Sequence, residues 1–400
     1  MKVLVLNCGS SSVKYKLFNM NNHEVMAQGG VEKLGLAGSF LKFTLPDGKK
    51  VVLERDLPEH NAAIEFILKV LTGEEYGCIK SLKEINAVGH RVVHGAEKFS
   101  SSVLITSEVI EQMVECIDLA PLHNPPNLKG IRAMQALMPD IPQVGVFDTA
   151  FHQTMPDYAY MYGLPYFMYS KYGVRRYGFH GTSHRYVSAR ACEILGVPYE
   201  EQRIITAHIG NGGSIAAIKD GKSVDTSMGM TPVEGLLMGT RCGDIDAGAL
   251  AYIMEREGLD SNGVSDLINK RSGVLGLSEN LSSDMRDIET AVAAGNKLAI
   301  LALKVYNYRI KKYIGAYAAA LGGVDILVFT GGVGENQWIT REAVCTDMEY
   351  MGMKLDVGKN NGMKGEEMVI STPDSKVTIM VVPTDEEYMI ASDTMEILSK

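Results

Sequence analysis

Residues 2–17 read KVLVLNCGSSSVKYKL, and residues 203–218, which begin 201 positions later, read RIITAHIGNGGSIAAI with the same pattern. Each stretch has an apolar strand, a turn of small residues and a second strand, which predicts a β-hairpin with a glycine-rich tip. Such tips leave backbone N–H groups exposed, and these suit a phosphate oxygen. Two ordinary tight turns are the alternative interpretation. The repetition of the hairpin pattern half a chain apart favours a duplicated nucleotide-binding fold.

Strand and helix patterns alternate between and after the two hairpins. Residues 61–72 and 296–321 place apolar side chains at helical spacing, which predicts a one-sided helix and a longer helix. Residues 85–95 and 143–147 predict buried strands, and polar residues lie at the ends of both. The chain is therefore expected to have an α/β fold.

A third glycine-rich segment lies near the C-terminus. Residues 325–330 predict a strand, and Gly331 to Asn336 predict a loop directly after it. The order of strand, glycine loop and helix is typical of α/β nucleotide sites. No Pro/Ser-rich linker is present in the sequence, so the repeat alone places a domain boundary near residue 150.

The composition excludes several classes of protein. A chain of 400 residues is longer than one hydrophobic core normally serves, and 46% apolar with 22% charged residues is typical of globular proteins. The net charge of −9 and the lack of long basic runs disfavour nucleic acid and membrane surfaces as partners. The longest apolar runs are strand-sized, and the first is too short for a signal peptide, so a cytoplasmic location is expected. Six cysteines without a C-x-x-C pair predict reduced thiols.

The common nucleotide and metal motifs do not match. A Walker A loop fails at Ala216, and a dinucleotide fingerprint fails at Ile215. His180 and His184 are four residues apart but have no Glu between them, so a zinc site is not predicted.

Cationic and polar side chains next to the glycine-rich segments remain as candidates. Arg91 ends an apolar strand, where a guanidinium needs an anionic partner, and a structural salt bridge is an equally good interpretation. Arg241 lies between glycines, and Lys14 returns from the first hairpin tip. Asp148 and His180 are either site residues or structural ones. Together these residues predict a site for a phosphoryl group in transfer.

Eight motifs, in order over nearly the whole chain, resemble those of the acetate kinase family. They are NCGSSSVKYKLF, HRVVHG, LAPLHNPPN, VFDTAFHQTMP, YGFHGTSH, HIGNGGS, GTRCGDID and TGGVGEN. This family belongs to a superfamily that includes acetate and sugar kinases, heat-shock chaperone ATPases and actin. The resemblance therefore implies two duplicated actin-like (ribonuclease H-like) lobes, each a mixed sheet flanked by helices, with a nucleotide cleft between them.

The resemblance also implies the extent of each lobe. The N-terminal lobe would comprise residues 1–150 together with a C-terminal helix of residues 386–400. The C-terminal lobe, residues 151–385, would bind the nucleotide and form a homodimer.

The implied reaction is the reversible phosphorylation of acetate by Mg-ATP, which gives acetyl phosphate and ADP. The expected cofactor is Mg²⁺ or Mn²⁺. A carboxylic acid is ionised at neutral pH, so acetate needs no general base and direct in-line transfer is expected. A covalent phosphoenzyme on Glu386 or Asp148 stays open.

The resemblance assigns roles to individual residues. The catalytic residues would be Asp148, His180 and Arg241, the last two stabilising the phosphoryl group in transfer. Arg91 would bind the substrate carboxylate, beside an apolar pocket for the methyl group formed by Val93, Leu122, Phe179 and Pro232. Asn7 and Glu386 would hold the metal. The residues expected to bind ATP are Ser10, Ser12, Lys14, His208, Ile209, Gly210, Asn211, Gly212, Asp284, Met285, Arg286, Gly332, Val333, Gly334, Glu335 and Asn336.

Four positions depart from the family pattern. Gly213 replaces a serine in the second hairpin, which removes a hydroxyl near the nucleotide, and Ala247 replaces a proline. Ala96 replaces a common glycine. Cys8 replaces Ala or Ser, and we expect its thiol to make the site sensitive to oxidation.

Three other functions are considered. A propionate or butyrate kinase on the same fold differs by only one or two methylene groups in the acid, although Val93 and Pro232 favour the short acid. A non-catalytic actin-like filament or chaperone-like ATPase is disfavoured by Arg91 and its apolar neighbours. Pyrophosphate as donor is disfavoured because the glycine loop at 332–336 leaves room for adenine.

Overall fold

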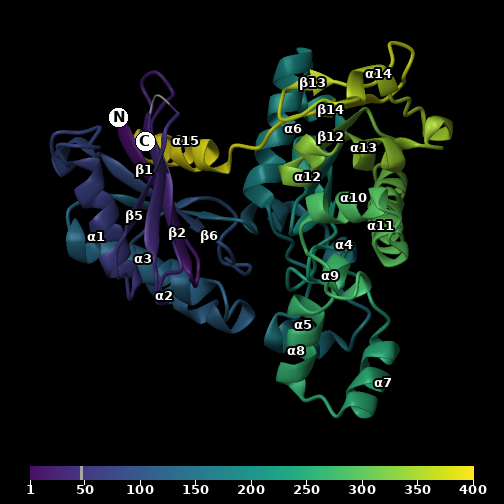
Figure 1. Cartoon of the computed structure of the whole chain (residues 1–400), viewed down its shortest axis with the longest axis horizontal. Coiled ribbons are helices and arrows are strands. Elements are labelled where there is room, and N and C mark those ends of the chain that lie inside the picture. The colour runs from purple at the N-terminus through teal and green to yellow at the C-terminus, as the bar shows by residue number, and fades with distance from the viewer. Residues whose placement is uncertain (46–47) are drawn as a thin grey trace. The chain divides into compact units, whose positions relative to one another are not determined.

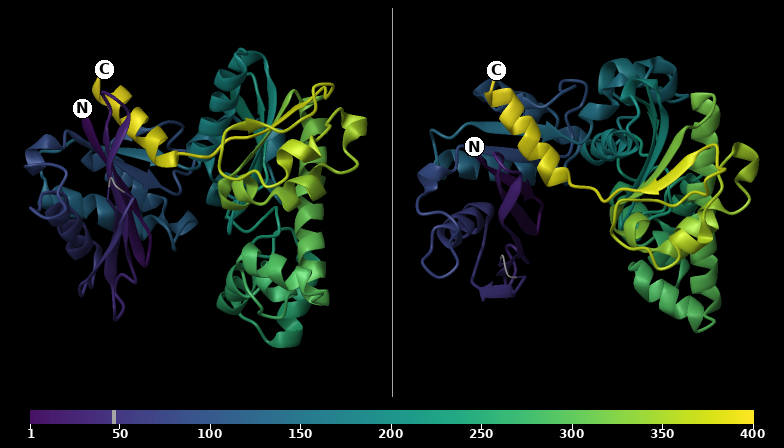
Figure 2. Two further views of the ribbon diagram at one scale, coloured as in Figure 1. Left: turned by 45° about the horizontal axis from the view of Figure 1, so that its top comes forward. Right: turned by 90° about the horizontal axis from the view of Figure 1, so that it is seen from above.

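The computed structural model of the chain describes residues 1–45 and 48–400, which divide into two compact units (Figure 1). Unit 1 comprises Met1–Phe151 and Asp385–Lys400, and unit 2 comprises His152–Thr384. Each unit contains a mixed β-sheet flanked by helices (Figure 2). Among the described residues, no helix combines the length and the apolarity that crossing a membrane requires.

The sheet of unit 1 has the strand order β5-β4-β3-β2-β1-β6-β8-β7. Its strands are β1 (Lys2–Cys8), β2 (Ser12–Asn19), β3 (Glu24–Glu32), β4 (Phe40–Thr44), β5 (Lys50–Glu54), β6 (Ala87–Val92), β7 (Val103–Leu104) and β8 (Gln143–Phe147). The predicted first hairpin is confirmed: β1 and β2 pair antiparallel, with Asn7 opposite Lys14 and Cys8 opposite Val13. Strands β1, β6 and β8 run parallel.

Helices cover both faces of this sheet. They are α1 (His60–Leu71), α2 (Ser107–Glu115), α3 (Asn124–Leu137) and α15 (Glu386–Leu398). Helix α1 confirms the amphipathic helix predicted at 61–72, and it packs with α3 over β1 and β2. Helix α15 packs against β1, β6 and β8 (Figure 2). Gly89 in β6 permits this contact, because a Cβ there would lie 2.6 Å from side-chain atoms of Ile390 and Thr394.

The sheet of unit 2 repeats the same arrangement, with the order β11-β10-β9-β12-β14-β13. Its strands are β9 (Arg203–Ile209), β10 (Gly213–Lys219), β11 (Lys222–Thr226), β12 (Ile326–Thr330), β13 (Met368–Val369) and β14 (Thr378–Val381). The second predicted hairpin is confirmed by the antiparallel pairing of β9 with β10. In unit 1 the antiparallel strands β3, β2 and β1 are followed in the sheet by β6 and β8, which run parallel to β1. In unit 2 the antiparallel strands β11, β10 and β9 are followed by β12 and β14, which run parallel to β9. This shared order supports a duplicated fold.

Unit 2 contains many helices. They are α4 (Asp157–Tyr160), α5 (Tyr166–Tyr172), α6 (Gly181–Leu195), α7 (Ala247–Glu257), α8 (Ser261–Lys270), α9 (Gly273–Leu277), α10 (Met285–Ala293), α11 (Lys297–Leu321), α12 (Gly331–Asn336), α13 (Trp338–Cys345) and α14 (Val357–Asn360). Short 3₁₀ turns occur at Leu82–Glu84, Ile117–Leu119, Ala150–Thr154, Tyr199–Glu201 and Glu349–Met351. Helix α11 packs on β9 and β10, and it confirms the long helix predicted at 296–321. It ends at Gly322, whose φ of 69° suits a residue without a Cβ.

Two predicted elements differ from the structure. The loop predicted at Gly331 to Asn336 is the short helix α12, because the Glu335 carboxylate accepts the backbone N–H of Gly331 at 2.9 Å and closes the turn. The strand predicted over 85–95 is shorter, and β6 ends at Val92. Beyond it, the backbone N–H groups of Val93 and His94 donate to asparagine side chains instead of to a neighbouring strand.

Candidate active site

Charged side chains meet at the carboxyl ends of two parallel strands in unit 1. Arg91 is the penultimate residue of β6, and Asp148 directly follows β8. The Arg91 guanidinium pairs with Asp148 through two hydrogen bonds, Nε to Oδ1 at 3.2 Å and Nη2 to Oδ2 at 2.7 Å. Glu386 Oε2, at the first residue of α15, lies 3.7 Å from Arg91 Nε. The structure thus brings together three residues that were predicted separately.

The electrostatics of this cluster favour a further cation. Burial raises the pKa of Glu386 to about 7, and the negative charge of Asp148 adds to that shift. Burial alone would lower the pKa of Arg91, but Asp148 and Glu386 outweigh it and raise the pKa. Carboxylates crowded around one guanidinium are hard oxygen donors, which suit Mg²⁺.

The residues present fit such an ion with few protein ligands. Within residues 1–45 and 48–400, no group of three or more His, Cys, Asp or Glu side chains is arranged to hold a metal. Mg²⁺ usually keeps several waters and binds one or two carboxylates together with substrate phosphates. Glu386 has a carboxylate at the first residue of α15, and Asn7, the penultimate residue of β1, has an amide oxygen; that these two groups hold the metal stays a prediction.

The first hairpin tip carries the predicted phosphate-binding hydroxyls. Ser10 and Lys14 are exposed, and Ser12 starts β2. The tip is held by the Gly9 backbone N–H, which donates to the Ser12 carbonyl at 2.9 Å. These groups are therefore presented on a closed turn.

Cys8 does not have the properties of a reactive thiol. Its side chain is 3% exposed and faces Gly130, where even a Cβ atom would overlap Sγ. Burial raises the pKa of the thiol to about 12, so the thiolate is not populated at neutral pH. This environment contradicts the expectation that Cys8 makes the site sensitive to oxidation.

In unit 2, His180 and Arg241 border the second hairpin tip. A Cβ atom on Gly212 would lie 3.2 Å from Arg241 Nη1 and 3.9 Å from His180 Cε1. His180 stacks on His208, with ring centroids 4.3 Å apart. The backbone of His180, directly before α6, has a φ of 56°, a left-handed conformation that is strained for a residue with a Cβ. The tip thus brings together two imidazoles and a guanidinium beside a glycine.

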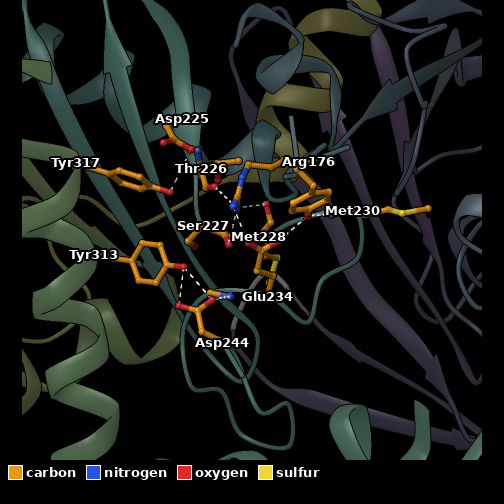
Figure 3. A network of polar contacts seen from close by, with 12 residues as sticks. Arg176, Asp225, Thr226, Ser227, Met228, Met230, Glu234, Asp244, Tyr313 and Tyr317 are labelled. Atoms are coloured by element: carbon orange, nitrogen blue, oxygen red, sulfur yellow. Dashed lines mark hydrogen bonds and ion pairs between the residues drawn. The ribbon is translucent and has the colours of Figure 1, made fainter. Parts of the chain in front are cut away.

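A polar network anchors the segment that carries Arg241 (Figure 3). Arg176 Nη1 donates to the carbonyl oxygens of Thr226, Ser227 and Met228 at 2.8, 3.0 and 3.2 Å, and Nη2 donates to Glu234 at 2.6 Å. Figure 3 shows Arg176 reaching over these three carbonyls at the end of β11.

The same network reaches helix α11. The Tyr313 hydroxyl donates to the Asp244 carboxylate at 2.9 Å, and Asp244 Oδ1 accepts the Gly235 backbone N–H at 2.9 Å. Arg241 itself donates from Nη1 to the Pro232 carbonyl at 3.2 Å. Burial lowers the pKa of Arg241, and a buried cation next to glycine amides suits an anionic ligand.

A pocket of about 710 Å³ lies beside this tip within unit 2. The predicted ATP residues that line it are Gly210, Asn211, Asp284, Met285, Arg286, Gly332, Val333 and Asn336. Its other lining residues are Ser283, Glu289, Gln337, Trp338, Ile339 and Lys364, which the sequence reasoning missed. A signal existed for one of them, because Trp338 is the single tryptophan of the chain and is separated from the TGGVGEN motif by one residue, Gln337.

Two predicted ATP residues have structural contacts of their own. The Glu335 carboxylate accepts the backbone N–H groups of Gly331 and Thr384, at 2.9 and 3.1 Å, and so holds the start of α12. Asp284 caps α10, and hydrogen bonds from Arg286 lower its pKa to about 2. His208, Ile209, Gly212 and Gly334 lie on β9, the tip and α12, next to the pocket-lining residues.

The residues predicted to surround the methyl group are divided between the units. Val93 follows β6 in unit 1, and Leu122, in the same unit, is 62% exposed. Phe179, 3% exposed, and Pro232 belong to unit 2.

Comparison with known proteins identifies the family. A model of the acetokinase family matches residues 2–392. The chain belongs to the acetokinase family. An acetate kinase from Parabacteroides distasonis is 78% identical over 400 residues, with both chains covered completely.

Solved structures of this family have the same fold. The crystal structure of Porphyromonas gingivalis acetate kinase, 70% identical, matches with a TM-score of 0.96 over 99% of each chain. A propionate kinase from Francisella tularensis, 41% identical, matches with a TM-score of 0.92 over 99% of each chain. The predicted family, its α/β fold of two mixed sheets flanked by helices, and its kinase class of enzyme are thereby confirmed.

Proposed function

We propose that this chain transfers the γ-phosphoryl group of ATP to acetate, reversibly, forming acetyl phosphate and ADP. The observation that carries the proposal is the pairing of Arg91 with buried Asp148. This pairing uses two of the five guanidinium N–H groups, and among the described residues no hydrogen bond uses the other three. A planar fork of donors beside a fixed carboxylate suits a small carboxylic acid.

Asp148 acts in this proposal as a positioning group. Acetate is already ionised at neutral pH, so the reaction needs no proton acceptor. Both Asp148 oxygens are bonded to Arg91, which fixes the guanidinium and makes Asp148 a poor nucleophile. We therefore favour direct in-line transfer over a phosphoenzyme on this residue.

The phosphoryl donor is ATP, held by unit 2. The 710 Å³ pocket would take the nucleoside, and the tip amides with His180 and Arg241 would contact the γ-phosphoryl group. Ser10, Ser12 and Lys14 would bind phosphate oxygens from the first hairpin. Mg²⁺, or Mn²⁺ in its place, would be held by Asn7 and Glu386 and would neutralise phosphate charge.

We also propose that the chain forms a homodimer through unit 2. Large aromatic side chains are exposed along residues 158–172: Tyr158 is 84% exposed, Tyr166 69%, Phe167 52% and Tyr172 53%. Tyr308, on α11 of the same unit, is 67% exposed. Such apolar surface is normally covered by another protein surface. Sedimentation velocity of the full chain would show a single dimer species, and a monomer at micromolar concentration would contradict this assignment.

A propionate kinase is the second candidate. A solved propionate kinase with 41% identity shares the fold, and one methylene changes binding by only about 1–3 kcal/mol. Val93 and Pro232 favour the shorter acid.

Acyl phosphate formation separates these functions. Hydroxylamine would trap the product formed from acetate, propionate or butyrate with Mg-ATP, and with pyrophosphate as an alternative donor. We expect the highest kcat/KM with acetate and ATP. A higher kcat/KM with propionate would make propionate the preferred substrate. Absence of acyl phosphate from every acid would overturn the proposal in favour of a non-catalytic ATPase.

A further inference from the structure

A continuous chain of hydrogen bonds runs behind His180 in unit 2. His180 Nδ1 lies 2.9 Å from Ser214 Oγ, and the same oxygen lies 2.7 Å from His184 Nε2. On the far side of that ring, His184 Nδ1 lies 2.6 Å from Thr206 Oγ1. Each hydroxyl has one proton, so each can donate only one of these hydrogen bonds.

His184, in the middle of this chain, lies where a charged imidazole is unfavourable. Its side chain is fully buried at 0% exposure. Burial lowers its pKa well below the ordinary value, and the neighbouring His152 and His208 lower it further. A neutral imidazole carries one ring proton, so one nitrogen donates and the other accepts.

Thr206 sets the direction of the chain. Its hydroxyl is buried at 0% exposure, and among the described residues its hydrogen-bond partner is His184 Nδ1 alone. If Thr206 accepted a proton from His184, its own hydroxyl proton would have no acceptor, which is costly in a dry interior. Thr206 therefore donates to Nδ1, His184 donates from Nε2 to Ser214, and Ser214 donates to Nδ1 of His180.

We infer that Thr206, His184 and Ser214 are positioning residues that hold His180 as a neutral imidazole with its proton on Nε2. The inference rests on the proposed function and defines how that site acts. His180 then offers a neutral N–H donor to the phosphoryl group in transfer, and Arg241 supplies the positive charge. An imidazolium at His180 would have to donate from Nδ1 to Ser214. Either the Ser214 proton would then lose its acceptor, or all three hydrogen bonds would reverse and the Thr206 proton would lose its own.

The backbone of His180 agrees with a constrained role. Its φ of 56° is a left-handed conformation that a side chain with a Cβ adopts only when its surroundings hold it there. The Ser214 bond fixes one edge of the ring, and stacking on His208 at 4.3 Å fixes its face.

The tautomer can be read directly by NMR of the full chain. The chain would be labelled with ¹⁵N in its histidine rings, and two-bond ¹H–¹⁵N correlations recorded at about pH 7.5, where an unperturbed histidine is mostly neutral. The His180 signals would be identified by their loss in His180→Gln. We expect a protonated Nε2 and an unprotonated Nδ1, and we expect Ser214→Ala to give a mixture of the two tautomers. A proton on Nδ1 in the wild type, or an unchanged tautomer in Ser214→Ala, would overturn the inference.

Kinetics of Thr206 variants test whether Thr206 affects catalysis through His184, Ser214 and His180. Thr206→Val keeps the volume and removes the hydroxyl, and we expect kcat to fall about tenfold or more with KM values for acetate and ATP within about twofold. Thr206→Ser keeps the donor and should restore kcat. An unchanged kcat in Thr206→Val, or an equal loss in Thr206→Ser, would contradict the inference.

Ser188→Ala is the matched control. Ser188 is a buried serine on the same helix as His184, and its hydroxyl contacts the His184 carbonyl and Tyr199 but no histidine ring. We expect Ser188→Ala to leave the His180 tautomer unchanged. A changed tautomer in this variant would show that a packing change alone alters the His180 ring signals, and it would overturn the inference. The NMR result needs no substrate, so a wild-type chain that forms no acyl phosphate would overturn the proposed function separately.

Discussion

The two sheets share the same order of central strands, but the residues at the carboxyl ends of their parallel strands differ in chemistry. In unit 1, β6 and β8 lead to Arg91 and Asp148, a charged pair with Glu386 beside it. In unit 2, the corresponding strands β12 and β14 lead to Thr330 and a segment ending at Thr384, which carry hydroxyls and no charge. The nearby polar groups of unit 2 are stacked imidazoles and glycine amides.

Under the proposed function, the difference would let one scaffold serve two ligands. Parallel strands bring their carboxyl ends to one edge, so each sheet gathers its functional groups there. A fixed guanidinium suits a small carboxylate, and the charged edge of unit 1 contains one. Backbone N–H groups, imidazoles and a guanidinium suit a polyphosphate, and the second hairpin tip of unit 2 gathers these groups.

Removing the guanidinium of Arg241 from unit 2 should have the largest effect on catalysis. In Arg241→Ala, we expect kcat to fall about 10³-fold, because an arginine on a phosphoryl group in transfer stabilises developing charge. KM for acetate should change little, since Arg91 lies in the other unit. Steady-state assays of acetyl phosphate formation measure both. Arg256→Ala is the control, because within residues 1–45 and 48–400 Arg256 stacks on Tyr252 and has no other charged or hydrogen-bonded partner, and an equal loss there would contradict the assignment.

A variant of Arg341 tests how much its buried hydrogen bonds stabilise unit 2. It is 0% exposed and donates to Asn360 Oδ1 and to the carbonyls of Gly334, Glu335 and Met363. Arg341→Met leaves these acceptors unsatisfied, so we expect the free energy of unfolding to fall by about 3–5 kcal/mol in urea titrations.

The matched control for Arg341 is an arginine at the surface of the same unit. Arg190 pairs with Glu367 at 2.7 Å and is partly exposed, and Arg190→Met should cost less than about 1 kcal/mol. Equal losses in the two variants would mean that burial of Arg341 contributes nothing.

Buried neutral histidines should make stability depend on pH. Burial lowers the pKa of His90 in unit 1 to about 4, and that of His152 in unit 2 to about 4. The unfolded chain therefore binds more protons between pH 6.5 and 4, so stability is full above 6.5 and falls by about 1.4 kcal/mol per pH unit for each such histidine. Glu386, whose raised pKa has the opposite sign, offsets part of the loss.

A single variant isolates this contribution. In His90→Gln we expect the slope of unfolding free energy against pH, measured by urea titrations from about pH 7 to 5, to decrease by about one proton. Gln keeps a polar group near Gln143, which now bonds His90 at 2.7 Å. An unchanged slope would show that His90 is protonated in the folded chain.

The smallest expected effect concerns backbone strain in unit 1. Ala96 has a φ of 49°, where a Cβ is unfavourable. Ala96→Gly should stabilise the chain by about 0.5 kcal/mol, because relief of strain exceeds the entropy that glycine loses on folding. Ala62→Gly, inside helix α1, should instead destabilise by about 1 kcal/mol, and the same sign for both variants in thermal unfolding would contradict this account.

Local patterns predicted the elements well. Both hairpins, α1 and α11 follow from alternation and helical spacing within short windows. The resemblance marked Ala96 as unusual, but only its φ shows the strain.

Contacts between distant residues could not be predicted in the same way. Arg91 and Asp148 were each candidates, yet they lie 57 positions apart, and their pairing depends on the β6–β8 register. The hydrogen bonds from His180 through Ser214 to Thr206 join α6 to two strands of the second hairpin. Hydroxyl directions there depend on burial, which no local sequence pattern reports. The roles proposed for the site residues stay predictions.

The most direct test of the central claim compares the wild type with Arg91→Ala in hydroxylamine-trapped acetyl phosphate formation. We predict that kcat/KM for acetate falls by at least about 10²-fold, since the guanidinium that would bind the acetate carboxylate is lost, while KM for ATP changes by less than about threefold. A fall in ATP binding with acetate use unchanged would place the carboxylate elsewhere and contradict the division of roles between the two units.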